Sequence, residues 1–126
     1  MHRSRLAGVI IDCQTDDLDA AAEFWGKALG APATDKANLE ESPYIELPMP
    51  KDQNYVEIQA VDHASRVHID IESDDIEAEV KRLEALGAKR VADIKRWCVL
   101  EAPTGQRFCI VPVVSQDFEE KANKWE

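Results

Sequence analysis

The pattern of hydrophobic and polar positions occurs twice along the chain. Residues 9–18 (VIIDCQTDDL) and 67–76 (VHIDIESDDI) align at a spacing of 58 positions, and alternating apolar residues pass into helical spacing in both copies. Alternation predicts a strand, and apolar residues three to four apart predict a helix. Both helical segments close on the same letters, ALGA, at 28–31 and 85–88. Two copies indicate duplicated half-domains rather than a solenoid, which needs roughly three or more repeats.

Capping and turn residues set the limits of the predicted elements. Asp16 or Asp17 can cap the first helix and Gly30 ends it, while Gly87 stops a second helix over 75–86. A short C-terminal helix is predicted over 115–126, with Phe118, Ala122 and Trp125 on one side. The predicted strands are 8–14, 33–37, 43–47, 55–61, 66–72, 88–93, 97–101 and 107–113. We therefore expect a single α+β domain over 1–126, with βαβββ repeats at about 5–61 and 65–113.

Alternation also predicts which side chains share a face of the first strand in each copy. One face is apolar in both copies, and helices are expected to cover it from outside. The other face is largely polar, although an isoleucine in the first copy stands where the second has a histidine. These positions are Ile10, Asp12 and Gln14 in the first copy, and His68, Asp70 and Glu72 in the second. We expect the repeats to form a curved mixed sheet that turns these polar faces towards a central cleft.

Composition narrows the classes of function. The 126 residues carry a formal net charge of −10, which disfavours binding to nucleic acid or to anionic membranes. No apolar run approaches the length of a membrane span, and no signal peptide is recognisable. Three cysteines without CxxC spacing suit reduced thiols. These features predict a cytoplasmic globular protein.

Several short motifs support a family resemblance that covers about residues 5–113. The first copy has Asp16-Asp17-Leu18, Phe24-Trp25 and Leu29-Gly30, and the second has RVHID at 66–70, PTGQ at 103–106 and Phe108-Cys109. With the two βαβββ copies, these motifs resemble the vicinal-oxygen-chelate superfamily of glyoxalases, extradiol dioxygenases and bleomycin-resistance proteins. The glyoxalase-like subgroup is the most similar. The resemblance implies a small-molecule ligand and a homodimer, whereas the fold by itself does not define a reaction.

The resemblance also implies where a metal would bind. Family metal sites take one ligand from the first and one from the last strand of each copy. The corresponding positions here are Ile10, Glu57 (or Gln59, if the register shifts by two), His68 and Cys109. Isoleucine cannot coordinate a metal, and Cys109 stands where the family usually has a glutamate. His68 and Glu57 alone would hold a divalent ion poorly. We therefore expect no metal, with His68, Glu57 and Cys109 as the alternative set for zinc, nickel, manganese or iron.

The candidate binding residues each allow more than one role. Asp12 and Asp70 could attract a cationic group or accept backbone N–H bonds. His68 could act as a general base or simply hydrogen-bond to Asp70 or Glu57. Trp97 could stack on a flat ligand or pack within the fold. The predicted ligand-binding set is Asp12, Tyr55, Glu57, Gln59, His68, Asp70, Trp97, Arg107 and Cys109.

Three functions follow from these residues. The leading hypothesis is a metal-free cleft that binds a small organic molecule, with cationic molecules as candidates because of the paired carboxylates and the acidic charge. The alternative is an enzyme: either a metal-dependent lyase, isomerase or dioxygenase acting on a vicinal-oxygen substrate, or a metal-free enzyme with His68 as its base. A protein-interaction module ranks third, since no charge block or disordered tail supports it.

Overall fold

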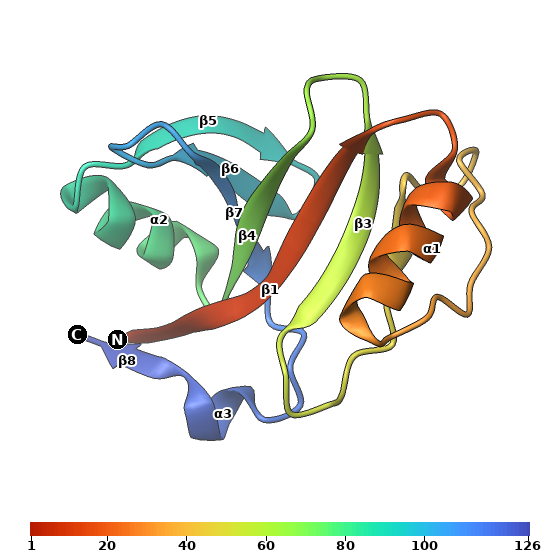
Figure 1. Cartoon of the computed structure of the whole chain (residues 1–126). Helices are drawn as coiled ribbons and strands as arrows, with labels where there is room; N and C mark the ends of the chain where they lie inside the picture. The colour runs from red at the N-terminus through yellow and green to blue at the C-terminus, as the bar shows by residue number, and fades with distance from the viewer. The chain divides into compact units, whose positions relative to one another are not determined.

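The computed structural model describes residues 1–126 and contains eight strands and three helices (Figure 1). Backbone contacts divide the chain into two units: residues 8–67, here called the N-terminal unit, and residues 1–7 with 68–126, called the C-terminal unit. Parallel and antiparallel pairings both occur, which confirms the predicted α+β class. The elements are β1 (His2–Gln14), α1 (Leu18–Leu29), β2 (Tyr44–Glu46), β3 (Tyr55–Val61), β4 (Arg66–Ser73), α2 (Ile76–Ala85), β5 (Lys89–Ile94), β6 (Trp97–Glu101), β7 (Arg107–Pro112), α3 (Phe118–Lys121) and β8 (Asn123–Trp125).

In the N-terminal unit the strands follow the order β2-β3-β1, with β1 parallel to β3 and β2 antiparallel to it. Helix α1 packs its buried face on these strands, where Leu18 and Ala22 share a core with Ile58. The Asp17 carboxylate accepts a hydrogen bond from the Ala20 N–H at 3.1 Å, which caps the helix. Gly30 ends it in the left-handed conformation, with φ 72°. Both predicted helix ends are confirmed.

The strand predicted over 33–37 is wrong, so the first repeat is βαββ. This segment has no ladder partner. Its apolar positions Ala33 and Ala37 pack against the core of the N-terminal unit, and the Ala37 N–H donates to the Asp19 carboxylate at 2.8 Å. The Asp19 carboxylate thus accepts the hydrogen bond from the Ala37 N–H that a carbonyl of a neighbouring strand would accept in a sheet.

In the C-terminal unit the strands follow the order β4-β7-β6-β5, and α2 lies beside them (Figure 1). This second repeat has the predicted βαβββ order. Val80 of α2 packs with Leu100 of β6 and Ile110 of β7, and all three are fully buried. The prediction that helices cover the whole apolar face of β4 is only partly right, because Ile71 packs in this core whereas Val67 and Ile69 are exposed. Helix α2 packs against only the last part of β4.

The C-terminal helix predicted over 115–126 is wrong. Only Phe118–Lys121 is helical, and residues 123–125 form β8, which pairs antiparallel with the start of β1. The N–H and the hydroxyl of Ser115, at the start of the predicted helix, both donate to Glu72 of β4 instead. Of the three apolar residues predicted on one side of that helix, Phe118 is buried, beside Arg3. Long-range pairing with β1 therefore overrides the local helical pattern.

A buried carboxylate fixes this C-terminal strand. Glu79 of α2 is fully buried and accepts bonds from the Ser4 hydroxyl at 2.7 Å and from Arg82 at 2.8 and 2.9 Å, while His2 Nε2 lies 2.8 Å away. Trp125 Nε1 donates to the Ser4 hydroxyl at 2.9 Å, and the Arg82 guanidinium lies 3.8 Å from the centre of the Trp125 ring. Burial alone would raise the pKa of Glu79, but the hydrogen bonds from Arg82, Ser4 and His2 outweigh it and bring the pKa to about 2. The carboxylate is therefore ionised at neutral pH.

Candidate functional site

Three predicted site residues meet on the sheet of the C-terminal unit. His68 and Asp70 lie two positions apart on β4, and Cys109 pairs with Asp70 from the parallel strand β7. His68 Nε2 is 3.8 Å from Asp70 Oδ1, and one donor atom from each of the three residues lies within 4.8 Å of the other two. Asp70 is buried and the other two are half-buried. An imidazole, a carboxylate and a thiol thus converge on one place.

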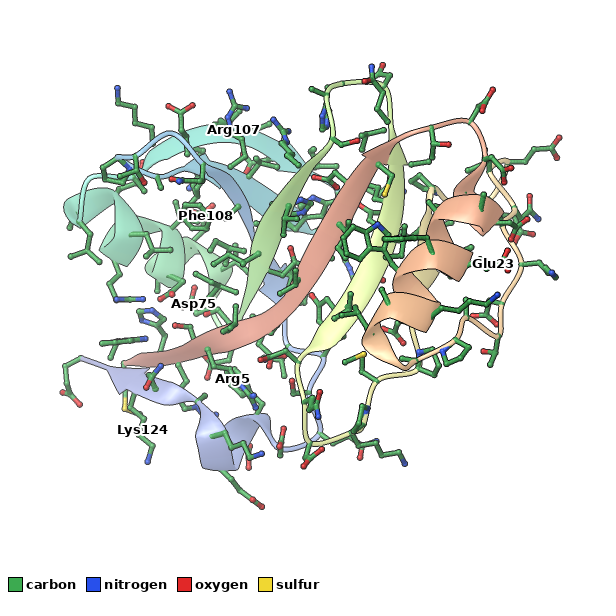
Figure 2. The ribbon with its side chains drawn as sticks, in the orientation of Figure 1. Arg5, Glu23, Asp75, Arg107, Phe108 and Lys124 are labelled. Carbon is green, nitrogen blue, oxygen red and sulfur yellow. The ribbon has the colours of Figure 1, made fainter.

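The predicted residues Trp97 and Arg107 flank this cluster. Val99 of β6 pairs with Cys109, and Trp97 lies two positions from Val99, so alternation puts all three on one face of the sheet. Arg107 lies on the same face, two positions before Cys109, and its Nε is 3.3 Å from Glu101 Oε1. Figure 2 shows Phe108 between the strands and α2, whereas Arg107 lies near β5 and away from that helix. The cluster is therefore on the face of the sheet opposite α2.

The face of the sheet beneath α2 is a packed core, which fixes the strands that carry the site residues. Cys98, Leu100 and Ile110 alternate with the site residues and form the core under α2. Burial raises the pKa of the Cys98 thiol to about 11, and a hydrogen bond with Asp93 acts in the same direction. Cys98 is thus a packed, protonated thiol on the core face, whereas Cys109 lies on the site face.

Glu72, next on the polar face of β4, has a structural role. It is fully buried and accepts hydrogen bonds from the backbone N–H groups of Val114 and Ser115 at 2.8 and 3.0 Å. Arg5 Nε lies 3.8 Å from the same carboxylate, and the Arg5 guanidinium also donates to Asp117 at 3.1 Å. Glu72 therefore fixes the segment after β7 and is not a ligand-binding group.

The N-terminal unit holds the other four predicted residues. Asp12 is buried, with only 2% of its surface exposed, and its carboxylate lies 3.8 Å from the Nε of Arg66. Gln59 pairs with Asp12 and Glu57 pairs with Ile10 across the parallel β1–β3 ladder. Arg66 was missed by sequence reasoning, although alternation along 66–72 places it on the polar face of β4 with His68. The cationic group beside Asp12 in the structure is therefore the guanidinium of Arg66 from the chain itself.

The two ladders settle which positions of the repeats correspond. Asp70 aligns with Asp12 at the repeat spacing, and their ladder partners are Cys109 and Gln59. Gln59, the shifted alternative, is therefore the counterpart of Cys109, and Ile10 and Glu57 lie one step further along the ladder. Ile10 is fully buried. The first repeat thus has isoleucine, aspartate and glutamine at the positions of the histidine, aspartate and cysteine.

Tyr55, the fourth of these residues, is held by its neighbour across the ladder. It pairs with Gly8, and a Cβ added at Gly8 would overlap the carbons of the Tyr55 ring. The ring lies close against Gly8 of β1 because glycine leaves the space for it. This packing limits how far the side chain could turn towards a ligand.

Replacing Gly8 with alanine is therefore expected to lower the free energy of unfolding by about 1–3 kcal/mol, the usual cost of overpacking. Urea denaturation would measure it. In a Tyr55→Ala background the same substitution should cost much less, because the overlapping ring is gone. An equal cost in both backgrounds would show that the Tyr55 ring is not the obstacle.

A separate hollow of about 340 Å³ lies in the N-terminal unit, between α1 and residues 32–36. Its lining includes the charged side chains of Glu23, Lys27 and Lys36. None of the predicted ligand-binding residues lines it. It is therefore a different surface feature from the sites described above.

Comparison with known proteins identifies the class to which this fold and site belong. A profile of the glyoxalase-like domain family matches residues 8–111, so the chain belongs to this family, within the vicinal-oxygen-chelate superfamily. A search of curated proteins gives no significant sequence match. No helix has the length and apolar character needed to cross a membrane.

Solved structures agree on the fold. A hypothetical protein from Bacillus halodurans C-125 is 13% identical with a TM-score of 0.65, over 90% of this chain and 96% of that one. Methylmalonyl-CoA epimerase from Mycobacterium tuberculosis is 18% identical with a TM-score of 0.62, over 86% and 88%. A variant of the Streptomyces coelicolor epimerase in complex with 2-nitronate-propionyl-CoA is 17% identical with a TM-score of 0.56, over 86% and 98%. At such identities the likeness concerns the fold alone.

Proposed function

We propose that this glyoxalase-like domain binds a small organic molecule on the sheet face of the C-terminal unit, and that it needs no metal to do so. The observation that carries the proposal is the convergence of His68, Asp70 and Cys109, whose donor atoms lie within 4.8 Å of one another on the face opposite α2. Ligand sites typically combine a small number of convergent polar groups with apolar side chains around them. Here Val99 and Trp97 supply the apolar part.

The donors favour a ligand with a positively charged or amine group. Asp70 is 7% exposed, so its carboxylate has few water contacts to lose when such a group arrives. His68 can donate or accept a hydrogen bond in its neutral form. Arg107 lies on the same face of the sheet, with its Nε 3.3 Å from Glu101 Oε1. Its guanidinium would contact a second, acidic group of the ligand. Structural neighbours that carry the name methylmalonyl-CoA epimerase, one with a bound acyl-CoA analogue, support small-molecule binding by this fold.

A thermal-shift screen on protein dialysed against a chelator tests this proposal. Matched sets of amine, neutral and carboxylate compounds are compared, and amines are expected to raise the melting temperature by several degrees. A ligand at a hundredfold its Kd stabilises the folded state by about 2.7 kcal/mol, and this stabilisation produces the shift. Asp70→Asn should abolish the shift. Asp52→Asn, which removes an exposed loop carboxylate, should leave it unchanged. No stabilisation by any compound, or a shift that survives Asp70→Asn, would contradict the proposal.

The alternative function is a metal-dependent enzyme, and the same cluster favours it. Three protein ligands are the usual number for a catalytic zinc, and His68, Asp70 and Cys109 supply one donor each. They would hold the ion, which when bound would polarise two adjacent oxygens of the substrate. Without metal, His68 would instead take a proton from the carbon next to a carbonyl and leave an enolate. Elemental analysis of the purified protein and of His68→Ala distinguishes these cases, since a stoichiometric ion lost in the variant would establish the metal site.

We also propose that the protein works as a cytoplasmic homodimer. The superfamily membership supports a dimer. Three free cysteines, none in a disulfide, support a reducing compartment. Sedimentation at several protein concentrations would test the dimer directly.

A further inference from the structure

The edge strands of the two units differ in the sign of their charge. In the C-terminal unit the last strand is β5, which pairs only with β6, and in the N-terminal unit it is β2, which pairs only with β3. An unpaired strand edge exposes backbone N–H and C=O groups that can pair with another strand. The two edges differ in sequence in a way that suits them to each other.

The β5 edge is basic in a chain that is otherwise strongly acidic. Residues 89–96 (KRVADIKR) contain four basic residues and one acidic residue, against a net charge of −10 for the whole chain. Arg90 is occupied by Glu77 at 2.8 Å and Asp93 at 3.0 Å. Lys89, Lys95 and Arg96 are exposed. The edge thus presents three positive charges to solvent.

The same hairpin exposes apolar surface and an unusual backbone conformation. Val91 and Ile94 of β5 are 42% and 41% exposed. Lys95, in the two-residue turn to β6, has φ 53° and is the single non-glycine residue with a positive φ. The left-handed region is uncommon for a residue with a side chain. The turn therefore holds the charged side chains of its tip at some conformational cost.

The β2 edge and the turn before it have the complementary character. Residues 39–46 (LEESPYIE) contain three glutamates and no basic residue, and Glu40, Glu41 and Glu46 are exposed. Leu39 is 49% exposed beside them. This edge thus combines negative charge with an exposed apolar side chain, as a counterpart to the basic and apolar β5 edge.

We propose that the β5 edge of one molecule docks on residues 39–46 of a second copy of this chain, an inference that rests on the homodimer proposed above. Like charges disfavour pairing of two β5 edges or two β2 edges, while opposite charges favour β5 against β2. Lys95 and Arg96 would face Glu40 and Glu41, and Val91 and Ile94 would cover Leu39. The charge pattern therefore selects both the partner and the pairing.

Charge reversal with sedimentation equilibrium tests this docking. Lys95→Glu/Arg96→Glu and, separately, Glu40→Lys/Glu41→Lys are each expected to raise the dissociation constant for self-association at least about tenfold. Raised salt should weaken the wild-type association, since exposed charges are screened. Lys81→Glu/Lys124→Glu is the matched control for the Lys95/Arg96 variant, because it reverses two exposed lysines of the same unit with the same change of net charge. It should leave the constant within about twofold.

Restoration makes the test specific. An equimolar mixture of the two double variants should associate with close to wild-type affinity, and so should the variant that carries all four substitutions. Circular dichroism melting of each variant shows that it is folded. An association unaffected by either reversal, or a failure of both restorations, would overturn this docking and leave the homodimer standing. A wild-type protein that stays monomeric at every concentration would overturn both proposals.

Discussion

Replacing Glu79 with alanine is expected to lower the free energy of unfolding by about 3–5 kcal/mol. The carboxylate is fully buried and is the common partner of Ser4, Arg82 and His2, so its removal leaves several donors without an acceptor. The loss would also free Trp125, because Ser4 and Arg82 both hold that ring. Urea denaturation would give the free energy, and proteolysis would show release of residues 123–126.

The matched control is Glu84→Ala on the same helix. Glu84 is exposed, so its substitution should change stability by no more than about 0.5 kcal/mol. Glu79→Gln keeps the shape and part of the hydrogen bonding, and should fall between the two. A cost for Glu79→Ala as small as that for Glu84→Ala would mean that the buried network does not support the fold.

The same carboxylate predicts how stability depends on pH. Its pKa is about 2 in the folded protein and 4.5 in its ordinary state. A carboxyl group with a lowered pKa stabilises the fold fully above its ordinary pKa, and this contribution disappears as the pH falls from about 4.5 towards 2. The free energy of unfolding of the wild type should therefore fall more steeply over this acid range than that of Glu79→Gln. Parallel curves for the two proteins would contradict the assignment.

Replacing Leu100 with alanine is the second large effect expected. Leu100 is fully buried beneath α2 with Val80 and Ile110, and a cavity there costs about 2–5 kcal/mol. The substitution should also weaken ligand binding, because the same strand positions Val99 beside Cys109 on the other face. Guanidinium denaturation and the thermal-shift screen would measure the two effects.

Val99→Ala separates the two faces of β6. Val99 is half-buried on the site face, so its truncation should cost clearly less stability than Leu100→Ala. It should still reduce the ligand-induced shift by removing apolar contact. If Val99→Ala were the more destabilising of the two, the assignment of core and site faces would be wrong.

Local patterns predicted most of the elements. The 58-residue repeat located both helices, and the strand predicted over 55–61 has the same limits as β3. Two segments failed for one reason, namely that distant residues supply their hydrogen bonds. Residues 33–37 are held by Asp19, and residues 123–125 pair with β1 at the far end of the chain.

The candidate site was predicted in composition and only partly in arrangement. Alternation put His68 and Asp70 on one face, and that relation follows from backbone geometry alone. Cys109 joins them through the β4–β7 register, which no local pattern specifies. The role of Glu72 was missed because Val114 and Ser115, which donate to it, lie 42 and 43 positions away. For Glu79, Arg82 is a neighbour on the helix, but His2 and Ser4 lie 77 and 75 positions away, and no local pattern points to them.

The sequence by itself determined the duplicated strand–helix order, the membership in the glyoxalase-like family and the replacement of a possible ligand by Ile10. These depend on residue identity and short periodicities, which are properties of neighbouring positions. Only the tertiary structure decided that Asp70 and Cys109 are neighbours and that Glu72 and Glu79 are buried structural carboxylates. Strand register and burial arise from contacts between distant segments, and such contacts are settled by the packing of the whole unit.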